Sequence, residues 1–189
     1  MARWEPGTAA RLQQAAMELF TSQGFERTTA AEIAAACGVT ERTFFRHFTD
    51  KRDVLFRGQD EFERVFVDAL DTVSPGVTPM KAVMTALRGG ASWFDDERRP
   101  HSRMRQGVID ANPPLQERER HKLAGLADTL AGALRARGVP EPAATLAAQT
   151  GTTVFGVAFG QWIADGETRP LDAIADDVLR ELTALTGEA

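Results

Sequence analysis

The segment TAAEIAAACGVTERTFFRHF, residues 29–48, decides the fold of the N-terminal part of this chain. Its first half predicts a short helix, because the Thr29 hydroxyl can cap a first turn and Glu32 can reach back to complete a capping box. Gly38 suits the positive φ at which a helix ends, and Thr40 can cap a second helix two residues later. We therefore expect two short helices joined by a tight turn.

The second helix, residues 41–47, is predicted to have two chemically different faces. At about 100° per residue, Phe44 and Phe48 share one side, whereas Arg42 and Arg46 lie nearly opposite. The rings would hold the helix on a small core, and the guanidinium groups suit guanine edges or phosphates. Two arginines at this spacing can also be a merely solvated face, but this capped arrangement is typical of a helix that enters a DNA groove.

The pattern around this segment resembles the DNA-binding region of the tetracycline-repressor (TetR) family of bacterial regulators. The residues that match lie between about Arg11 and Leu55 at fixed spacing and include Leu19-Phe20, Gly24-Phe25, Thr29, Ile33-Ala34, Gly38-Val39-Thr40, Thr43, Phe44-Phe45, His47-Phe48, Lys51 and Val54-Leu55. The family usually has Tyr where this chain has Phe45. A phenyl ring can pack against a sugar or a thymine methyl, but it cannot donate a hydrogen bond to a phosphate.

The resemblance implies an all-α protein of about nine helices. Residues 1–50 would form a three-helix helix-turn-helix DNA-binding domain, and residues 51–189 a helical ligand-binding and dimerisation domain. It further implies a sequence-specific transcriptional regulator, a ligand-responsive repressor that binds an inverted-repeat operator as a homodimer.

Nine residues are expected to contact DNA. They are Thr29, Thr40, Glu41, Arg42, Thr43, Phe45, Arg46, His47 and Lys51. Two of them have open alternatives. Glu41 can accept from a cytosine amine or can simply favour the helix N-terminus through the dipole, and His47 can contact a phosphate or end the helix. An N-terminal arm with Arg3 and Trp4 could reach a minor groove or could be a plain extension.

The rest of the chain has helical periodicity throughout. We expect helices at residues 8–23, from residue 50 to about residue 70, after Pro79 with a weak point at Gly89-Gly90, at residues 98–111, around residues 123–134, at 142–165 and at 170–186. Small residues recur along 142–165. They indicate either tight packing within one subunit or the homodimer interface that the family forms with its last two helices, here residues 142–186.

A second group of residues could line a cavity for a small apolar or amphipathic ligand. Its members are aromatic or methionine side chains at helical spacing, namely Met84, Trp93, Phe94, Met104, Phe155, Phe159 and Trp162. Such walls adapt to many ligands, although the same pattern also fits a plain core. Arg103 and Arg105 could bind an anionic group there or could be exposed.

Charge and composition limit the remaining possibilities. The net charge is -5, and the five basic and three acidic residues of segment 39–57 leave a small local excess, so affinity for DNA would come from placed contacts. The single cysteine, Cys37, and the lack of an apolar run of about 20 residues or a signal peptide favour a cytoplasmic protein. We expect a buried, inert thiol at Cys37 rather than a redox sensor.

Catalytic and metal-binding chemistry have no counterpart in the sequence. No nucleophile–base pair, phosphate loop or metal-ligand spacing stands out, so we expect no catalytic residues, no cofactor, no metal and no enzyme activity. The alternative function that we consider is a helical protein-interaction adaptor that keeps the fold without reading DNA.

Overall fold

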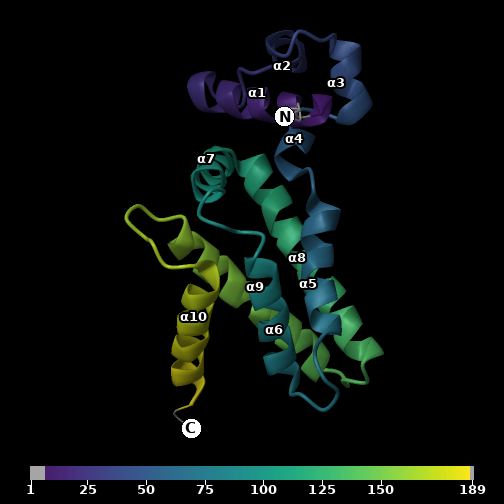
Figure 1. Ribbon diagram of the computed structural model, residues 1–189, viewed down its shortest axis with the longest axis vertical. Coiled ribbons are helices and arrows are strands. Elements are labelled where there is room, and N and C mark those ends of the chain that lie inside the picture. Colours follow the sequence, from purple (N-terminus) through teal and green to yellow (C-terminus); the bar gives the residue numbers. More distant parts are fainter. Residues whose placement is uncertain (1–6, 188–189) are drawn as a thin grey trace, which may run out of the picture. The chain divides into compact units, whose positions relative to one another are not determined.

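The computed structural model describes residues 7–187, which form ten helices and no strand (Figure 1). The helices are α1 (Thr8–Gln23), α2 (Ala30–Ala36), α3 (Glu41–His47), α4 (Asp53–Phe56), α5 (Gln59–Asp71), α6 (Pro79–Ala91), α7 (Arg99–Asp110), α8 (Pro113–Ala136), α9 (Ala143–Trp162) and α10 (Leu171–Thr186). The predicted all-α class is confirmed. The N-terminal arm with Arg3 and Trp4 lies outside the described residues.

The predicted caps of α2 and α3 are present. The Thr29 hydroxyl accepts from the Glu32 amide at 3.2 Å, and the Glu32 carboxylate accepts from the Thr29 amide at 2.8 Å. Gly38, at φ +67°, turns the chain after α2, and the Thr40 hydroxyl accepts from the Thr43 amide at 3.2 Å. The backbone donors at both helix starts therefore have side-chain partners.

The single helix predicted from residue 50 to about residue 70 is wrong. The chain forms the short α4, becomes extended at Arg57 and turns at Gly58, whose φ is +85°. Only glycine adopts this left-handed conformation without a steric cost. The Gly58 carbonyl then accepts from the Phe62 amide at 2.8 Å in the first turn of α5. This break raises the count from the expected nine helices to ten.

The chain divides into two compact units. One runs up to Arg57 and also takes in Met104–Glu117, and the other consists of Gly58–Arg103 and the chain from Arg118 onward. Helices α7 and α8 each have residues in both units. The division of function expected at residues 50 and 51 stays a prediction.

The core of the first unit is built from distant parts of the sequence. Phe20 of α1, Ile33 of α2 and Phe44 of α3 are buried together. Val108 and Ile109 of α7 complete this core, together with Leu115 of α8. The sequence pattern around residues 29–48 gives no sign of this downstream contribution.

The second unit contains the larger core, which α5, α6, α8, α9 and α10 share. Gly89 and Gly90, predicted as a weak point, instead lie inside α6 where it packs on α5. A Cβ at Gly90 would be 2.3 Å from the Phe66 ring, and one at Gly89 would be 2.3 Å from the Cβ of Ala69. The two glycines are therefore the point of close approach between these helices. Of the helices within residues 7–187, none has the length and hydropathy needed to cross a membrane.

Candidate DNA-binding surface

Helix α3 has one buried and one exposed side, as its sequence predicts. Phe44 is fully buried and Phe48 is almost so, and their ring centroids are 5.3 Å apart. Arg42 and Arg46 are exposed, and neither forms a hydrogen bond or an ion pair with any residue in the described part of the chain. The phenylalanines hold the helix in place, and all guanidinium donors remain available for a partner.

An exposed aromatic ring lies between the two arginines in the sequence. Phe45 is 51% exposed, and its ring meets that of Phe44 edge to face at 5.4 Å. Glu41 and His47, at the two ends of α3, are also exposed. The exposed side of α3 therefore combines two guanidinium groups with one apolar ring.

The predicted threonines have their hydroxyls engaged in the caps. The Thr29 hydroxyl donates to Glu32 at 2.9 Å, so its hydrogen is already in use. The hydroxyls of Thr40 and Thr43 lie 3.0 Å apart and share one hydrogen bond. One hydrogen of this pair therefore remains for an external acceptor, because each hydroxyl carries one.

Lys51, which is expected to contact a phosphate, has its ammonium group engaged within the protein. Its ammonium group donates to the carbonyl oxygens of Phe25, Glu26 and Thr28 at 2.7, 3.2 and 3.0 Å. An ammonium group has three donors, and all three are used within the protein. The side chain is half-buried and lies 4.4 Å from the centre of the Phe25 ring.

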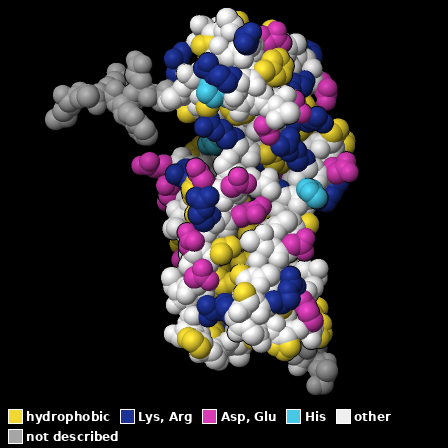
Figure 2. All heavy atoms as spheres, turned by 90° about the vertical axis from the view of Figure 1, so that its right-hand side faces the viewer, with side chains coloured by type: hydrophobic (Ala, Val, Ile, Leu, Met, Phe, Trp, Pro, Cys, Tyr) yellow, Lys and Arg dark blue, Asp and Glu magenta, His cyan; other side chains and the backbone are white. Residues whose placement is uncertain are grey.

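The turn after α3 is organised by Asp50. Its carboxylate accepts from the amides of Arg52 and Asp53 at 2.8 and 3.0 Å and from the Arg52 guanidinium at 2.6 Å. Burial raises the pKa of Asp50, but these hydrogen bonds and the Arg52 charge outweigh it, so the net pKa is lowered. Asp50 therefore stays ionised and offsets the charge of Arg52. Figure 2 shows basic side chains on the surface of the part that carries α1–α3, with acidic ones among them.

Six of the seven residues predicted to line a ligand cavity belong to one cluster in the second unit. Phe94 has Phe155 and Trp162 at centroid distances of 5.7 Å and Phe159 at 5.5 Å. Met84 is buried in the same core, and Trp93 packs against it. Met104 is in the first unit and is 45% exposed, so the structure does not bring it to this cluster.

Two buried hydrogen-bond donors in the second unit have no acceptor among the described residues. They are the indole N–H of Trp162, whose side chain is fully buried, and the Nε–H of Arg99, which is 8% exposed. The Arg99 guanidinium lies 5.0 Å from the centre of the Trp162 ring, and its other nitrogens donate to the carbonyls of Glu167 and Arg169 and to Asp96. The sequence does not single out Arg99, because it stands in a charged run, 95–99, that is typical of a solvated turn.

The guanidinium groups of Arg103 and Arg105 donate hydrogen bonds to backbone carbonyls within their own units. Arg103 donates to the carbonyls of Ile163 and Ala164 at 2.6 and 2.8 Å, beyond the end of α9. Arg105 donates to the Leu55 carbonyl at 2.8 Å and lies over the Phe56 ring. Arg103 is exposed, as one of the two alternatives expects, although its donors are engaged, whereas Arg105 is half-buried.

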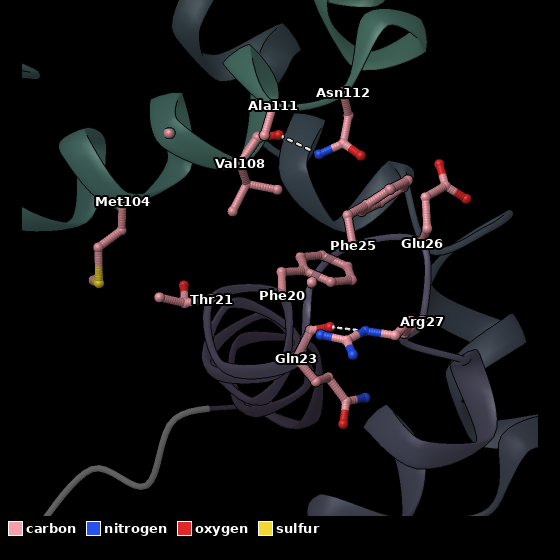
Figure 3. A pocket seen from close by; sticks show the side chains of 12 residues that line it. Phe20, Thr21, Gln23, Phe25, Glu26, Arg27, Met104, Val108, Ala111 and Asn112 are labelled. Atoms are coloured by element: carbon pink, nitrogen blue, oxygen red, sulfur yellow. Dashed lines mark hydrogen bonds between the residues drawn. The ribbon is translucent and has the colours of Figure 1, made fainter.

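A pocket of about 520 Å³ opens in the first unit, away from α3 (Figure 3). Its walls are formed by the end of α1, the loop at residues 24–27, and residues 104–112, which include the second half of α7. Phe20, Phe25 and Val108 form the apolar lining, and Met104 lies at one edge. None of the nine residues expected to contact DNA lines it.

Within residues 7–187 no group of three or more His, Cys, Asp or Glu side chains could hold a metal ion. Cys37 is only half-buried rather than buried as expected, and this partial burial raises the pKa of its thiol. A raised pKa lowers the thiolate fraction, as expected for an inert thiol.

Family models and known proteins match both parts of the chain. Residues 12–57 match the family model described as bacterial regulatory proteins, tetR family, and residues 77–186 match that of the MftR C-terminal domain. The transcriptional regulator TcmR of Streptomyces glaucescens is 40% identical over 81 residues, which are 43% of this chain and 36% of TcmR. A protein named as the mycofactocin biosynthesis transcriptional regulator MftR of Mycobacterium tuberculosis is 24% identical over 88% of this chain and 85% of its own length.

Solved structures share the fold. FadR of Bacillus subtilis, in complex with stearoyl-CoA, has a TM-score of 0.61 at 18% identity over 92% of this chain and 96% of that one. FadR of Thermus thermophilus, in complex with lauroyl-CoA, has a TM-score of 0.56 at 24% identity over 96% and 95%. The two family models, which match residues 12–57 and 77–186, show that the chain belongs to the tetracycline-repressor (TetR) family of DNA-binding transcriptional regulators.

Proposed function

We propose that the protein is a cytoplasmic repressor that reads its operator with the exposed side of α3. Arg42 and Arg46 supply the base or phosphate contacts, Phe45 packs against a thymine methyl or a sugar, and the Thr40–Thr43 pair donates its remaining hydrogen. The observation that carries the proposal is the pair of exposed, unengaged guanidinium groups on a helix held by two buried rings. Glu41 and His47 stand at the edges of this surface.

A selection of duplex DNA with the purified protein, followed by gel shifts, tests this proposal. Arg42→Ala and Arg46→Ala should each weaken operator binding by roughly 5- to 150-fold, because a good arginine–guanine pair contributes about 1–3 kcal/mol of discrimination. Arg64→Ala is a matched control, since Arg64 is an exposed arginine on α5 in the second unit. If both α3 variants bind like the parent, Arg42 and Arg46 do not read the operator. If the selection returns no sequence-selective duplex, an adaptor that does not read DNA replaces this function.

We further propose that the protein binds an inverted repeat as a homodimer through α9 and α10. Leu146 and Val157 of α9 are 59% and 48% exposed, and Leu185 of α10 is 81% exposed. On α9, Leu146, Val157 and Gly160 fall on one side of the helix. Gly156 and Gly160 have no atoms of the described subunit within 4 Å of a Cβ position, so packing within one subunit does not explain them.

Gly151, on the same helix, contrasts with these two glycines. A Cβ at Gly151 would be 2.2 Å from Val83 Cγ1, so this glycine is required by packing inside the subunit. For the small residues of α9, packing within one subunit and packing between two subunits therefore apply to different positions. Gly151 serves the core, and Gly156 and Gly160 leave room for a second copy of the chain.

The proposed effector is a small apolar or amphipathic molecule that binds at the aromatic cluster of the second unit. The six residues Met84, Trp93, Phe94, Phe155, Phe159 and Trp162 offer an apolar surface, and the unpartnered donors of Trp162 and Arg99 favour a ligand that carries an oxygen acceptor. The acyl-CoA molecules in the two FadR complexes combine these features.

Lauroyl-CoA and lauric acid are suitable first probes of the effector site. Either should quench tryptophan fluorescence and release the operator in a gel shift, and Trp162→Phe, which removes one donor, should weaken that response without changing operator affinity. Operator binding that is insensitive to both probes, together with unchanged fluorescence, would contradict an acyl ligand.

A further inference from the structure

Lys51 lies in the turn between α3 and α4, and its ammonium group reaches a different part of the chain. The three carbonyl groups that it binds belong to the loop between α1 and α2, 23 to 26 residues earlier. The carbonyls of Phe25 and Thr28 are partly buried at these contacts, and the Thr28 side chain is fully buried. Three convergent carbonyl oxygens match the three donors of one ammonium group.

The two segments that Lys51 joins flank the helix-turn-helix. The loop ends at Thr29, which caps α2, and the turn begins after Phe48, which ends α3. A second contact supports the link, because the charged nitrogen lies 4.4 Å from the centre of the Phe25 ring. The ring of Phe25 in turn packs on that of Phe20 of α1, at 5.0 Å. Lys51 therefore connects both ends of the helix-turn-helix with α1.

We infer that Lys51 is a positioning residue for DNA recognition rather than a phosphate ligand. It holds the α1–α2 loop against the α3–α4 turn and so fixes the orientation of α3 relative to the core of its unit. A residue that uses all its donors on carbonyl groups has none left for a phosphate oxygen. The inference rests on the proposed DNA surface of α3.

Two variants of Lys51 separate the possible roles. Lys51→Met keeps most of the side-chain volume and removes all donors. Lys51→Arg keeps the charge, but a planar guanidinium cannot place its donors as an ammonium group does, whereas it binds phosphate well. Arg57→Met is the control for charge, because it removes one exposed positive charge from the same unit, together with the contact of the Arg57 guanidinium over the Phe48 ring at 5.8 Å.

The measurement is the operator dissociation constant between 50 and 200 mM salt, at a temperature where melting curves show each variant folded. We expect both Lys51 variants to weaken binding at least tenfold with the salt slope of the parent, and Arg57→Met to change affinity less. Should Lys51→Met not fold, Lys51→Arg alone decides.

Two results would overturn the inference. If Lys51→Arg binds like the parent while Lys51→Met loses affinity and about one unit of salt slope, Lys51 is a phosphate ligand. If the variants melt earlier but bind with unchanged affinity when folded, Lys51 serves stability alone. Failure of the DNA surface itself is distinct, because the unmodified protein would then select no operator.

Discussion

Replacing Gly156 and Gly160 of α9 by alanine should have opposite effects on the subunit and on the dimer. Within the subunit, a Cβ at either position meets no described atom within 4 Å. Each change should therefore stabilise the helix by about 1 kcal/mol, the difference in helix propensity between the two residues.

The same double variant should weaken dimerisation if the side of α9 that carries Gly156 and Gly160 lies in the dimer interface. In a two-fold dimer each substitution occurs twice, so four methyl groups enter the contact. Overpacking costs at least about 1 kcal/mol per methyl, which gives roughly 4 kcal/mol in total and about a thousandfold increase in the dimer dissociation constant. Sedimentation velocity over a range of protein concentrations measures this constant, and urea unfolding at low concentration measures the subunit.

Two single variants provide controls. Gly132 lies in α8, outside the proposed interface of α9 and α10, and a Cβ there meets nothing closer than the flexible end of Arg135 at 3.8 Å. Gly132→Ala should therefore leave dimerisation unchanged. Gly151→Ala should destabilise the subunit, because its Cβ would clash with Val83. If the Gly156→Ala/Gly160→Ala protein dimerises as tightly as the parent, the two glycines do not lie in the dimer interface. If its subunit is less stable than that of the parent, the free space inferred around the two Cβ positions is refuted.

Three further predictions concern the caps and cores. Gly90→Ala should lower the free energy of unfolding by about 1–3 kcal/mol, since its Cβ would press on the Phe66 ring; unchanged urea midpoints would contradict this. Hydrogen bonds from the Thr29 amide and then from the Thr29 hydroxyl lower the pKa of Glu32 in the folded protein below its ordinary value of 4.5. The stability that the ionised Glu32 contributes is therefore fully present above pH 4.5 and is lost as the pH falls through the lower pKa of the folded protein. Acid melting curves of Glu32→Gln should therefore show a smaller loss than the parent, and identical losses would argue against the capping role. The Cys37 thiol, with its raised pKa, should react with a disulfide reagent at neutral pH more slowly in the folded than in the unfolded protein, and equal rates would disprove its protection.

The residues that form α2 and α3 could be predicted from sequence because their signals are local. A capping box, a glycine turn and an i, i+4 pair of phenylalanines act within a few residues of one another, so Thr29, Gly38, Phe44 and Phe48 are found where the pattern places them. The exposure of Arg42 and Arg46 follows from the same periodicity, because burying one side of a short helix leaves the other in solvent.

Other features depend on contacts between segments that are distant in the chain, and local patterns do not specify them. Lys51 was expected at a phosphate, but three carbonyl groups some 23 to 26 residues away bind its donors. Met104 has the same helical spacing as the ligand-cavity candidates, yet packing puts it in the other unit. Glycines 90, 151 and 160 look alike in sequence, and the atoms that surround each of them in the folded chain determine whether a methyl group would clash with Phe66, clash with Val83 or meet nothing within the described subunit.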